Sequence, residues 1–473
     1  MTLSEGWEMV VGLEVHTELK TRTKMFCGCP NEFGAPPNTH VCPVCLGLPG
    51  SLPVLNERAV ELAMAIGLAL HCTIAPSTFH RKNYFYPDMP KDFQISQYDR
   101  PINANGYLDL IDHSRVRIER AHLEEDTGKS THLGGSGRLH GADHSLVDYN
   151  RSGVPLVEIV SAPDIRSSAQ ARDYASELRA ILIATGASDG RMEEGSMRVD
   201  ANVSVRRADA PFGTRCEIKN LNSLRSLQRA IDYEAARQVA LLESGGVVRQ
   251  ETRHWDEARG VTATMRVKEE ADDYRYFREP DLVDLAPDAA WVERVRSGLG
   301  PLPAERRAAL LTLVGEVSEA QLDVVATVVD AGLDAIVRGA IERGVDPSLA
   351  LSRAANELAP DQGSITREGF AETLLMEQRG DLSATQSKAV LATLVDTGGD
   401  PHAIAADRGF ERLSSDSLEG VVGDIIDQHP DEWGRYREGD DKLAQFFVGL
   451  VMKATRGQAD GKAVIAALSA RRG

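Results

Sequence analysis

Four cysteines near the start of the chain have a spacing that could hold a metal ion. Cys27 and Cys29 form one close pair, and Cys42 and Cys45 form a second pair after a loop. Two such pairs can supply four thiolates in a tetrahedron, which is the arrangement of structural zinc sites. Four ordinary reduced thiols are the alternative. Because four protein ligands close the coordination shell, we expect this zinc to hold a loop and to do no chemistry.

Acidic residues and a histidine form a second group of side chains that could take part in catalysis or bind a metal ion. As a strand, the alternating segment 9–19 would place Glu14 and His16 on one face and its apolar side chains on the other. Glu158 lies inside the apolar run 155–160, where an unpaired carboxylate is costly to bury. A shared cation would satisfy these acids, and oxygen-rich ligation favours Mg²⁺ while His16 also suits Mn²⁺. The alternatives are a solvated strand face and pairing with Arg or Lys.

Two further segments could contact nucleic acid. The run 81–88 is dense in cationic and aromatic side chains, which can stack bases and hold phosphates, although such a run also suits an ordinary loop. The stretch 446–473 carries five lysines or arginines against one acid, which fits an RNA contact or a favourable helix dipole. No standard phosphate loop is present, because Leu123 stands where the motif before Gly128 requires glycine.

The cysteines, the acids and the histidine all lie in an N-terminal region that we expect to contain both strands and helices. Met197–Arg206 alternates like the first strand, and Arg215–Lys219 follows a loop, so together they predict an antiparallel hairpin with one polar face. Helices are expected over 56–71, 167–185 and 224–244. Beyond Pro301 the chain is rich in Ala, Leu and Val at helical spacing. We therefore predict an α+β class, with a mostly antiparallel sheet followed by all-α domains.

Length and composition set the wider frame. The 473 residues suggest about three domains, which we place at 1–290, 291–403 and 404–473. A content of 42% hydrophobic and 26% charged residues excludes a disordered or fibrous chain, and the net charge of −18 argues against a large nucleic-acid-binding face but allows a local basic patch. Because the sequence has no apolar run of membrane-spanning length, no secretory signal and only six cysteines, we expect a cytoplasmic protein without a membrane segment.

Taken together, short motifs along essentially the whole chain resemble the B subunit of the bacterial aspartyl/glutamyl-tRNA(Asn/Gln) amidotransferase. The matching segments, in chain order, are 12–16, 81–88, 94–97, 124–130, 155–160, 192–195, 198–202, 217–223, 250–253, 273–277 and 451–458.

The resemblance implies a cradle-like catalytic domain that amidates glutamate or aspartate on mischarged tRNA. ATP would activate the side-chain carboxylate by phosphorylation, with Mg²⁺ or Mn²⁺ to offset charge. It implies that Glu14, His16, Glu125 and Glu158 bind or orient the metal, with Glu124 nearby. Asp200 and Lys219, facing each other across the hairpin, would support the same site.

The resemblance also implies partners. Ammonia would come from glutamine hydrolysed by the amidase (A) subunit, in a heterotrimer with the small (C) subunit, since this chain carries no amidase motif. The family position of Lys82 implies that it lines or gates the ammonia tunnel, and a loop salt bridge is the alternative. The C-terminal domains would hold the body of tRNA(Gln) or tRNA(Asn). The rival hypothesis is a non-catalytic, zinc-stabilised RNA-binding scaffold.

Overall fold

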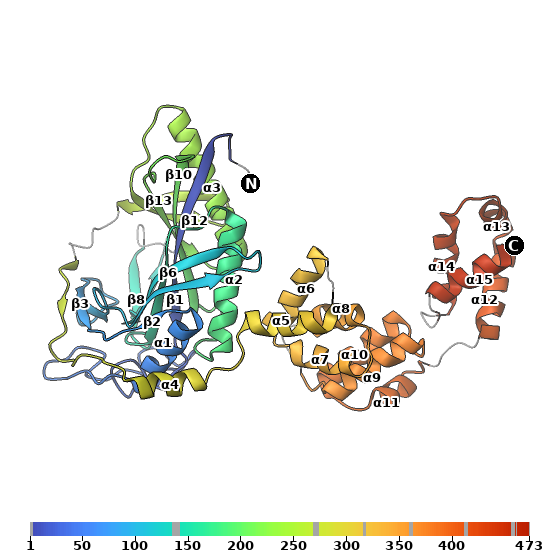
Figure 1. The fold of residues 1–473 in the computed structure, drawn as a ribbon, viewed down its shortest axis with the longest axis horizontal. Helices are drawn as coiled ribbons and strands as arrows, with labels where there is room; N and C mark the ends of the chain where they lie inside the picture. Colours follow the sequence, from blue (N-terminus) through green and yellow to red (C-terminus); the bar gives the residue numbers. More distant parts are fainter. Residues whose placement is uncertain are drawn as a thin grey trace. The chain divides into compact units, whose positions relative to one another are not determined.

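The computed structural model describes residues 3–134, 142–267, 274–315, 318–358, 363–410, 415–455, 459 and 461–472. The chain divides into two compact units, Met1–Leu302 and Pro303–Gly473 (Figure 1). The first unit combines a large sheet with helices, and the second is helical. The predicted α+β class is therefore confirmed.

The first unit is built on a twelve-stranded sheet with the order β13-β12-β11-β10-β1-β9-β6-β4-β3-β14, and β5 links β6 to β2. Among the described strands, β11 and β12 form its parallel pair and the other pairings are antiparallel. Strands β7 and β8 form a separate hairpin. The strands are β1 Trp7–Glu18, β2 Thr73–Ile74, β3 His80–Asn83, β4 Phe93–Ser96, β5 Asn103–Asp109, β6 Arg115–Glu125, β7 Lys129–Leu133, β8 His144–Asp148, β9 Pro155–Ser161, β10 Met197–Arg207, β11 Cys216–Leu221, β12 Glu251–Asp256, β13 Val261–Val267 and β14 Phe277–Arg278.

Helices cover one face of this sheet. Figure 1 shows α2 and α3 running beside the strands, and their apolar side chains join the core formed by Leu13 and Val15 of β1. Side-chain oxygens of Asn56, Ser167 and Ser223 accept hydrogen bonds from the first-turn amides of α1, α2 and α3, which fixes where these helices begin. The helices are α1 Glu57–Ala69, α2 Ser168–Ala184, α3 Leu224–Glu243 and α4 Ala289–Ser297.

Strand alternation leaves the opposite face polar. In β1, Leu13 and Val15 are fully buried in the core, while Glu14 and His16 point the other way and are partly exposed. The antiparallel register places His16 opposite Glu158 of β9, and Glu158 opposite His122 of β6. One row of polar side chains therefore crosses three adjacent strands.

The described residues of the second unit form three apolar clusters. One lies among the helices from α5 to α10 and includes Phe370, a smaller one lies among α9 to α11 and includes Val390, and the third lies among α12 to α15 and includes Phe447. No helix in the described part of the chain is long and apolar enough to span a bilayer. The helices are α5 Pro303–Val314, α6 Glu319–Asp330, α7 Asp334–Glu342, α8 Pro347–Glu357, α9 Arg367–Arg379, α10 Ala384–Thr397, α11 Pro401–Asp407, α12 Ser415–Gln428, α13 Pro430–Arg437, α14 Leu443–Ala454 and α15 Gly461–Arg472.

Candidate functional site

The polar row across β1, β9 and β6 forms the centre of the candidate site. His16 Nε2 lies 3.6 Å from Glu158 Oε2, and His122 Nε2 lies 3.5 Å from the same oxygen. Glu124 is two residues beyond His122 on β6 and so faces the same side, with its Oε2 3.9 Å from His122 Nε2. Two imidazoles and two carboxylates therefore converge on one point.

Three of these side chains meet the geometric needs of a metal site. Ligand atoms of His16, Glu124 and Glu158 all lie within 4.8 Å of one another. Oxygen and imidazole ligands suit Mg²⁺ or Mn²⁺, and two carboxylates would supply the balancing negative charge. The donor set therefore fits a divalent cation.

Burial strongly perturbs the protonation of this group. Burial opposes the charged form of His16, yet its hydrogen bond to Glu158 and the nearby carboxylates raise its pKa to about 9. Burial also opposes the charge of Glu158, but His122 and His16 hold the pKa of this carboxyl well below its usual range. For His122, burial dominates and lowers the pKa to about 4. A bound cation would have to displace the proton from His16.

The other predicted residues on β1, β10 and β11 border the same site. Glu14 Oε1 accepts a hydrogen bond of 2.9 Å from Asn202 Nδ2. Lys219 Nζ donates to Asp200 Oδ2 at 2.6 Å, so the hairpin brings this pair together as predicted, and Glu217 Oε1, which was not predicted, lies 3.1 Å from the same Nζ. Although burial disfavours the ammonium, Asp200 and Glu217 raise the pKa of Lys219 above its ordinary value.

A cavity of about 500 Å³ is lined by the two histidines and two carboxylates of the cluster, together with Glu14, Glu217 and Lys219. Arg120 and Arg215 join Lys82 and Lys219 on its walls, so cations surround the carboxylates and could receive phosphate groups. The ring of Tyr98 stacks on Tyr276 with 4.1 Å between centroids. The cavity thus combines a candidate metal site, phosphate-compatible cations and aromatic walls.

Lys82 of β3 is part of this cavity. Its Nζ lies 4.9 Å from the centroid of the Tyr274 ring. Burial disfavours its charge, but Glu124, together with Tyr276 and Glu158, raises the pKa of Lys82 above the ordinary lysine value. Lys82 thus faces the acidic cluster, and its expected role in an ammonia tunnel stays a prediction.

Glu125, which we expected to be a metal ligand, points away from the cluster. It is 2% exposed and pairs with the Lys91 ammonium, and its Oε1 also accepts a hydrogen bond of 2.9 Å from the Ile95 amide. Because successive strand residues face opposite sides, Glu124 and Glu125 cannot both reach the same ion. The structure thus brings Glu124 to the candidate ligands, and it does not bring Glu125.

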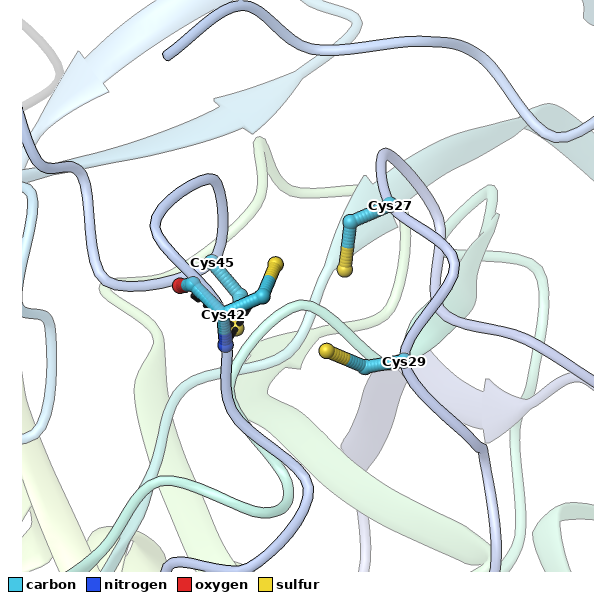
Figure 2. A group of neighbouring side chains, drawn as sticks. All are labelled: Cys27, Cys29, Cys42 and Cys45. Carbon is cyan, nitrogen blue, oxygen red and sulfur yellow. Dashed lines mark hydrogen bonds between the residues drawn. The ribbon is translucent and has the colours of Figure 1, made fainter.

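The cysteine quartet forms a second candidate metal site. Figure 2 shows the four sulfurs turned toward one another. The four Sγ atoms all lie within 4.8 Å of one another. Zn–S bonds of about 2.3 Å in a tetrahedron separate the sulfurs by about 3.8 Å, and the Sγ atoms of Cys42 and Cys45 are 3.9 Å apart. In the metal-free site, the hydrogen bond between Cys27 and Cys45 lowers the pKa of the Cys45 thiol to about 5 and raises the pKa of Cys27 above its ordinary value, so the bond stabilises the thiolate form at Cys45 and the thiol form at Cys27. The residues therefore fit zinc.

Sequence reasoning missed His122, Arg120 and Arg215. The signal for His122 was present, because alternation along β6 puts His122 and Glu124 on the face opposite Leu123 and Glu125. When residues 124–126 are considered only as a run of acids, the two-residue alternation of the strand is overlooked. The cavity positions of Arg120 and Arg215 depend on the sheet order, which the local pattern does not contain.

Comparisons with known proteins identify the family. The family model described as the GatB/GatE catalytic domain matches residues 9–293, and the one described as the GatB domain matches 349–471. The chain is 51% identical to the aspartyl/glutamyl-tRNA(Asn/Gln) amidotransferase B subunit of Frankia casuarinae, over 97% of this chain and 94% of the relative. It is 47% identical to the protein of the same name from Moorella thermoacetica, over 96% and 97% of the two chains. The chain therefore belongs to the family of aspartyl/glutamyl-tRNA(Asn/Gln) amidotransferase B subunits.

Proposed function

We propose that this chain is the subunit that activates and amidates the side-chain carboxylate of glutamate or aspartate on mischarged tRNA. The observation that carries the proposal is the meeting of His16, Glu124 and Glu158 in a cavity whose walls also hold four cationic side chains. The names of the relatives, which specify aspartyl/glutamyl-tRNA(Asn/Gln), support this substrate class. The proposal includes ATP as the source of activation.

The chemistry explains why such a cavity is needed. A carboxylate repels nucleophiles, and its oxygen is a poor leaving group. When a carboxylate oxygen attacks the γ-phosphorus of ATP, the bond to ADP breaks and an acyl phosphate forms. Ammonia then attacks the acyl carbon, phosphate leaves, and a proton is lost to give the amide. Both steps concentrate negative charge, so cations must surround the reacting groups.

The chain's own residues divide this work. We assign His16, Glu124 and Glu158 as the groups that would hold Mg²⁺ or Mn²⁺, with Glu14 beside them. The bound cation would offset phosphate charge and help to align the attacking and leaving oxygens. Lys82, Arg120 and Arg215 would bind phosphate oxygens from the cavity walls. Asp200 would orient the Lys219 ammonium, with which it pairs.

The helical unit and partner subunits complete the reaction scheme. We propose that the amidase (A) subunit and the small (C) subunit assemble with this chain and supply ammonia from glutamine. The tRNA body would contact residues 404–473, whose end is rich in basic side chains. Arg456 of the basic end lies outside the described residues, whereas Lys453 and Arg471 belong to α14 and α15.

We also propose that the cysteine quartet binds structural zinc. Four thiolates would close its coordination shell, so its contribution would be to hold the loop between Phe26 and Leu48 against the sheet. Serine in place of Cys42 should remove bound zinc, as measured by metal analysis of the purified chain.

One experiment separates this enzyme from a non-catalytic scaffold. The assembled complex is incubated with ATP and mischarged tRNA without glutamine, and ADP is measured. We expect tRNA-dependent ADP formation that is lost in Glu124→Gln and is retained in Glu119→Gln, a matched change on the same strand. If the wild-type complex forms no ADP above the tRNA-free background, the scaffold hypothesis is favoured and the proposal is wrong.

A further inference from the structure

The turn that carries the second cysteine pair packs directly on Lys91. Residues 42–47 form a tight turn in which the Leu46 amide donates to Cys42 O at 3.1 Å and the Gly47 amide donates to Val44 O at 3.0 Å. Gly47 has a φ of +67°, and a Cβ added there would overlap Lys91 Cγ and lie 3.1 Å from Lys91 Cα. The glycine therefore lets the cysteine turn press against the lysine stem.

Lys91 has little freedom on its other sides. Its Nζ pairs with Glu125 and lies 5.1 Å from the centroid of the Phe93 ring, and its side chain is 7% exposed. Both members of the pair line a cavity of about 300 Å³ whose wall also includes Cys27, Cys45 and Gly47. The position of this buried ion pair thus depends on the cysteine turn.

A second contact joins the cysteine site to the same pair. Gly153 has a φ of +84°, and a Cβ added there would lie 3.6 Å from Cys45 Cβ, 3.6 Å from Lys24 Cδ and 3.8 Å from Glu125 Oε2. The Lys24 side chain is fully buried, and its Nζ donates to Tyr149 O at 3.1 Å. The thiolate site, a buried cation and the Glu125 carboxylate therefore meet around one glycine.

From there, β4 and β6 lead to the candidate active site. The Ile95 amide donates to Glu125 Oε1 at 2.9 Å, and the next residue, Ser96, donates from Oγ to Glu124 Oε2 at 3.3 Å. Any shift of Glu125 would therefore be transmitted to Glu124 through both strands. Glu124 is the acid that faces His16 and Glu158.

We propose that the cysteine turn 42–47 is a positioning element for the amidation reaction. By pressing on Lys91 through Gly47, it fixes the Lys91–Glu125 pair and so holds Glu124 in place. Loading of the cysteine quartet with zinc thereby couples to the reaction centre, beyond holding a loop. The coupling to zinc rests on the zinc assignment made above, whereas the contact of Gly47 with Lys91 does not.

Chemical labelling of lysine amines tests the coupling without an activity measurement. The assembled complex, with measured zinc content, is treated with an amine-reactive reagent before and after zinc chelation, and labelling is read by mass spectrometry. We expect Lys91 to become labelled several-fold faster after chelation while labelling of Lys82 is unchanged. If neither lysine responds, zinc does not control the pair. If both respond alike, zinc merely stabilises the whole unit, and the inference is wrong.

Two glycines of the same loop provide a matched pair of variants. Gly47 and Gly50 both have positive φ, but a Cβ at Gly50 would meet nothing within 4 Å. We expect Gly47→Ala to lower kcat for amidation about ten- to hundredfold with an unchanged KM for tRNA, while both variants keep zinc. Gly50→Ala should match the wild type in kcat. Equal effects of the two substitutions would overturn the positioning role.

The two experiments also separate this inference from the zinc assignment. If the purified wild-type complex holds no zinc, then the zinc assignment and its coupling are both wrong, and the Gly47→Ala comparison still decides whether the turn positions Lys91. If zinc is present and Lys91 does not respond to its removal, the assignment stands and the coupling is refuted.

Discussion

Glu124 and Glu125 are neighbours with opposite environments, so the same substitution at each should have opposite effects. Glu125→Gln leaves the buried Lys91 ammonium without its counter-charge, although the amide oxygen can still accept from Ile95. Removing one partner of a buried pair costs about 3–5 kcal/mol, and we expect the lower end, about 3 kcal/mol. An unfolding entropy of about 2.1 cal/mol/K per residue applies to a unit that ends at Leu302. The Tm should therefore fall by about 5 °C.

Glu124→Gln should leave the metal-free chain as stable as the wild type or slightly more stable. Burial and the nearby Glu158 raise the pKa of Glu124, which means that the folded state disfavours its charge. The effect of Glu124→Gln should appear when metal is added, as a smaller rise in Tm than in the wild type. Mn²⁺ at about 100 times its Kd should stabilise the wild type by about 2.7 kcal/mol, or about 4 °C on the same scale. Glu124→Gln should lose that rise, whereas Glu125→Gln should keep only part of it, because Glu124 is still present but the Lys91–Glu125 pair that holds it is broken.

Thermal unfolding followed by tryptophan fluorescence, with and without Mn²⁺, measures both effects. Trp7, Trp255 and Trp291 lie in the first unit and Trp433 lies in the second, so three of the four tryptophans report on the relevant transition. The reasoning is refuted if Glu124→Gln lowers the metal-free Tm as much as Glu125→Gln does. It is refuted equally if Glu124→Gln keeps the full response to Mn²⁺.

Three further outcomes are expected. Burial and the nearby Asp126 raise the pKa of Glu18 to about 7. Because the unfolded chain ionises this carboxyl at a lower pH, the folded state loses stability as the pH rises from about 4.5 to 7. In urea unfolding, the free energy of unfolding of Glu18→Gln should therefore exceed that of the wild type by roughly 1–3 kcal/mol at pH 8 and match it at pH 4.5. Asp200→Asn leaves Lys219 with Glu217 as its remaining acidic partner. Because Asp200 orients the Lys219 ammonium on the cavity wall, this change should lower kcat for ADP formation about tenfold and leave Mn²⁺ binding unchanged. Deleting residues 404–473 should raise the KM for tRNA several-fold without changing Mn²⁺ binding, and an unchanged KM would contradict a tRNA contact there.

Local patterns were sufficient for much of the fold. Alternation in β1 and β10 correctly separated core from polar face, and the terminating glycines at 186 and 245 placed the ends of α2 and α3 within a residue or two. The same two-residue period predicts which strand residues share a face. It therefore explains why Glu14 and His16 point into one cavity.

The rest depends on which strands are neighbours. Glu158 meets His16 and His122 only because β9 lies between β1 and β6, and those strands are far apart in sequence. Glu125 was expected among the metal ligands for a different reason. The two-residue alternation along β6 places Glu124 and Glu125 on opposite faces, but residues 124–126 were considered together as one acidic run. The contact of Gly47 with Lys91 has no sequence signal at all, because it arises from loop packing.

The row of His16, Glu158 and His122 has a consequence for how related chains can vary in length. Its members meet only at a fixed alignment of three strands, and inserting or deleting one residue before any of them would rotate that side chain into the helix-covered core. Gaps in this family's alignments should therefore avoid β9 between Pro155 and Ser161 and gather in connections such as Ala210–Gly213, where added length leaves the row intact.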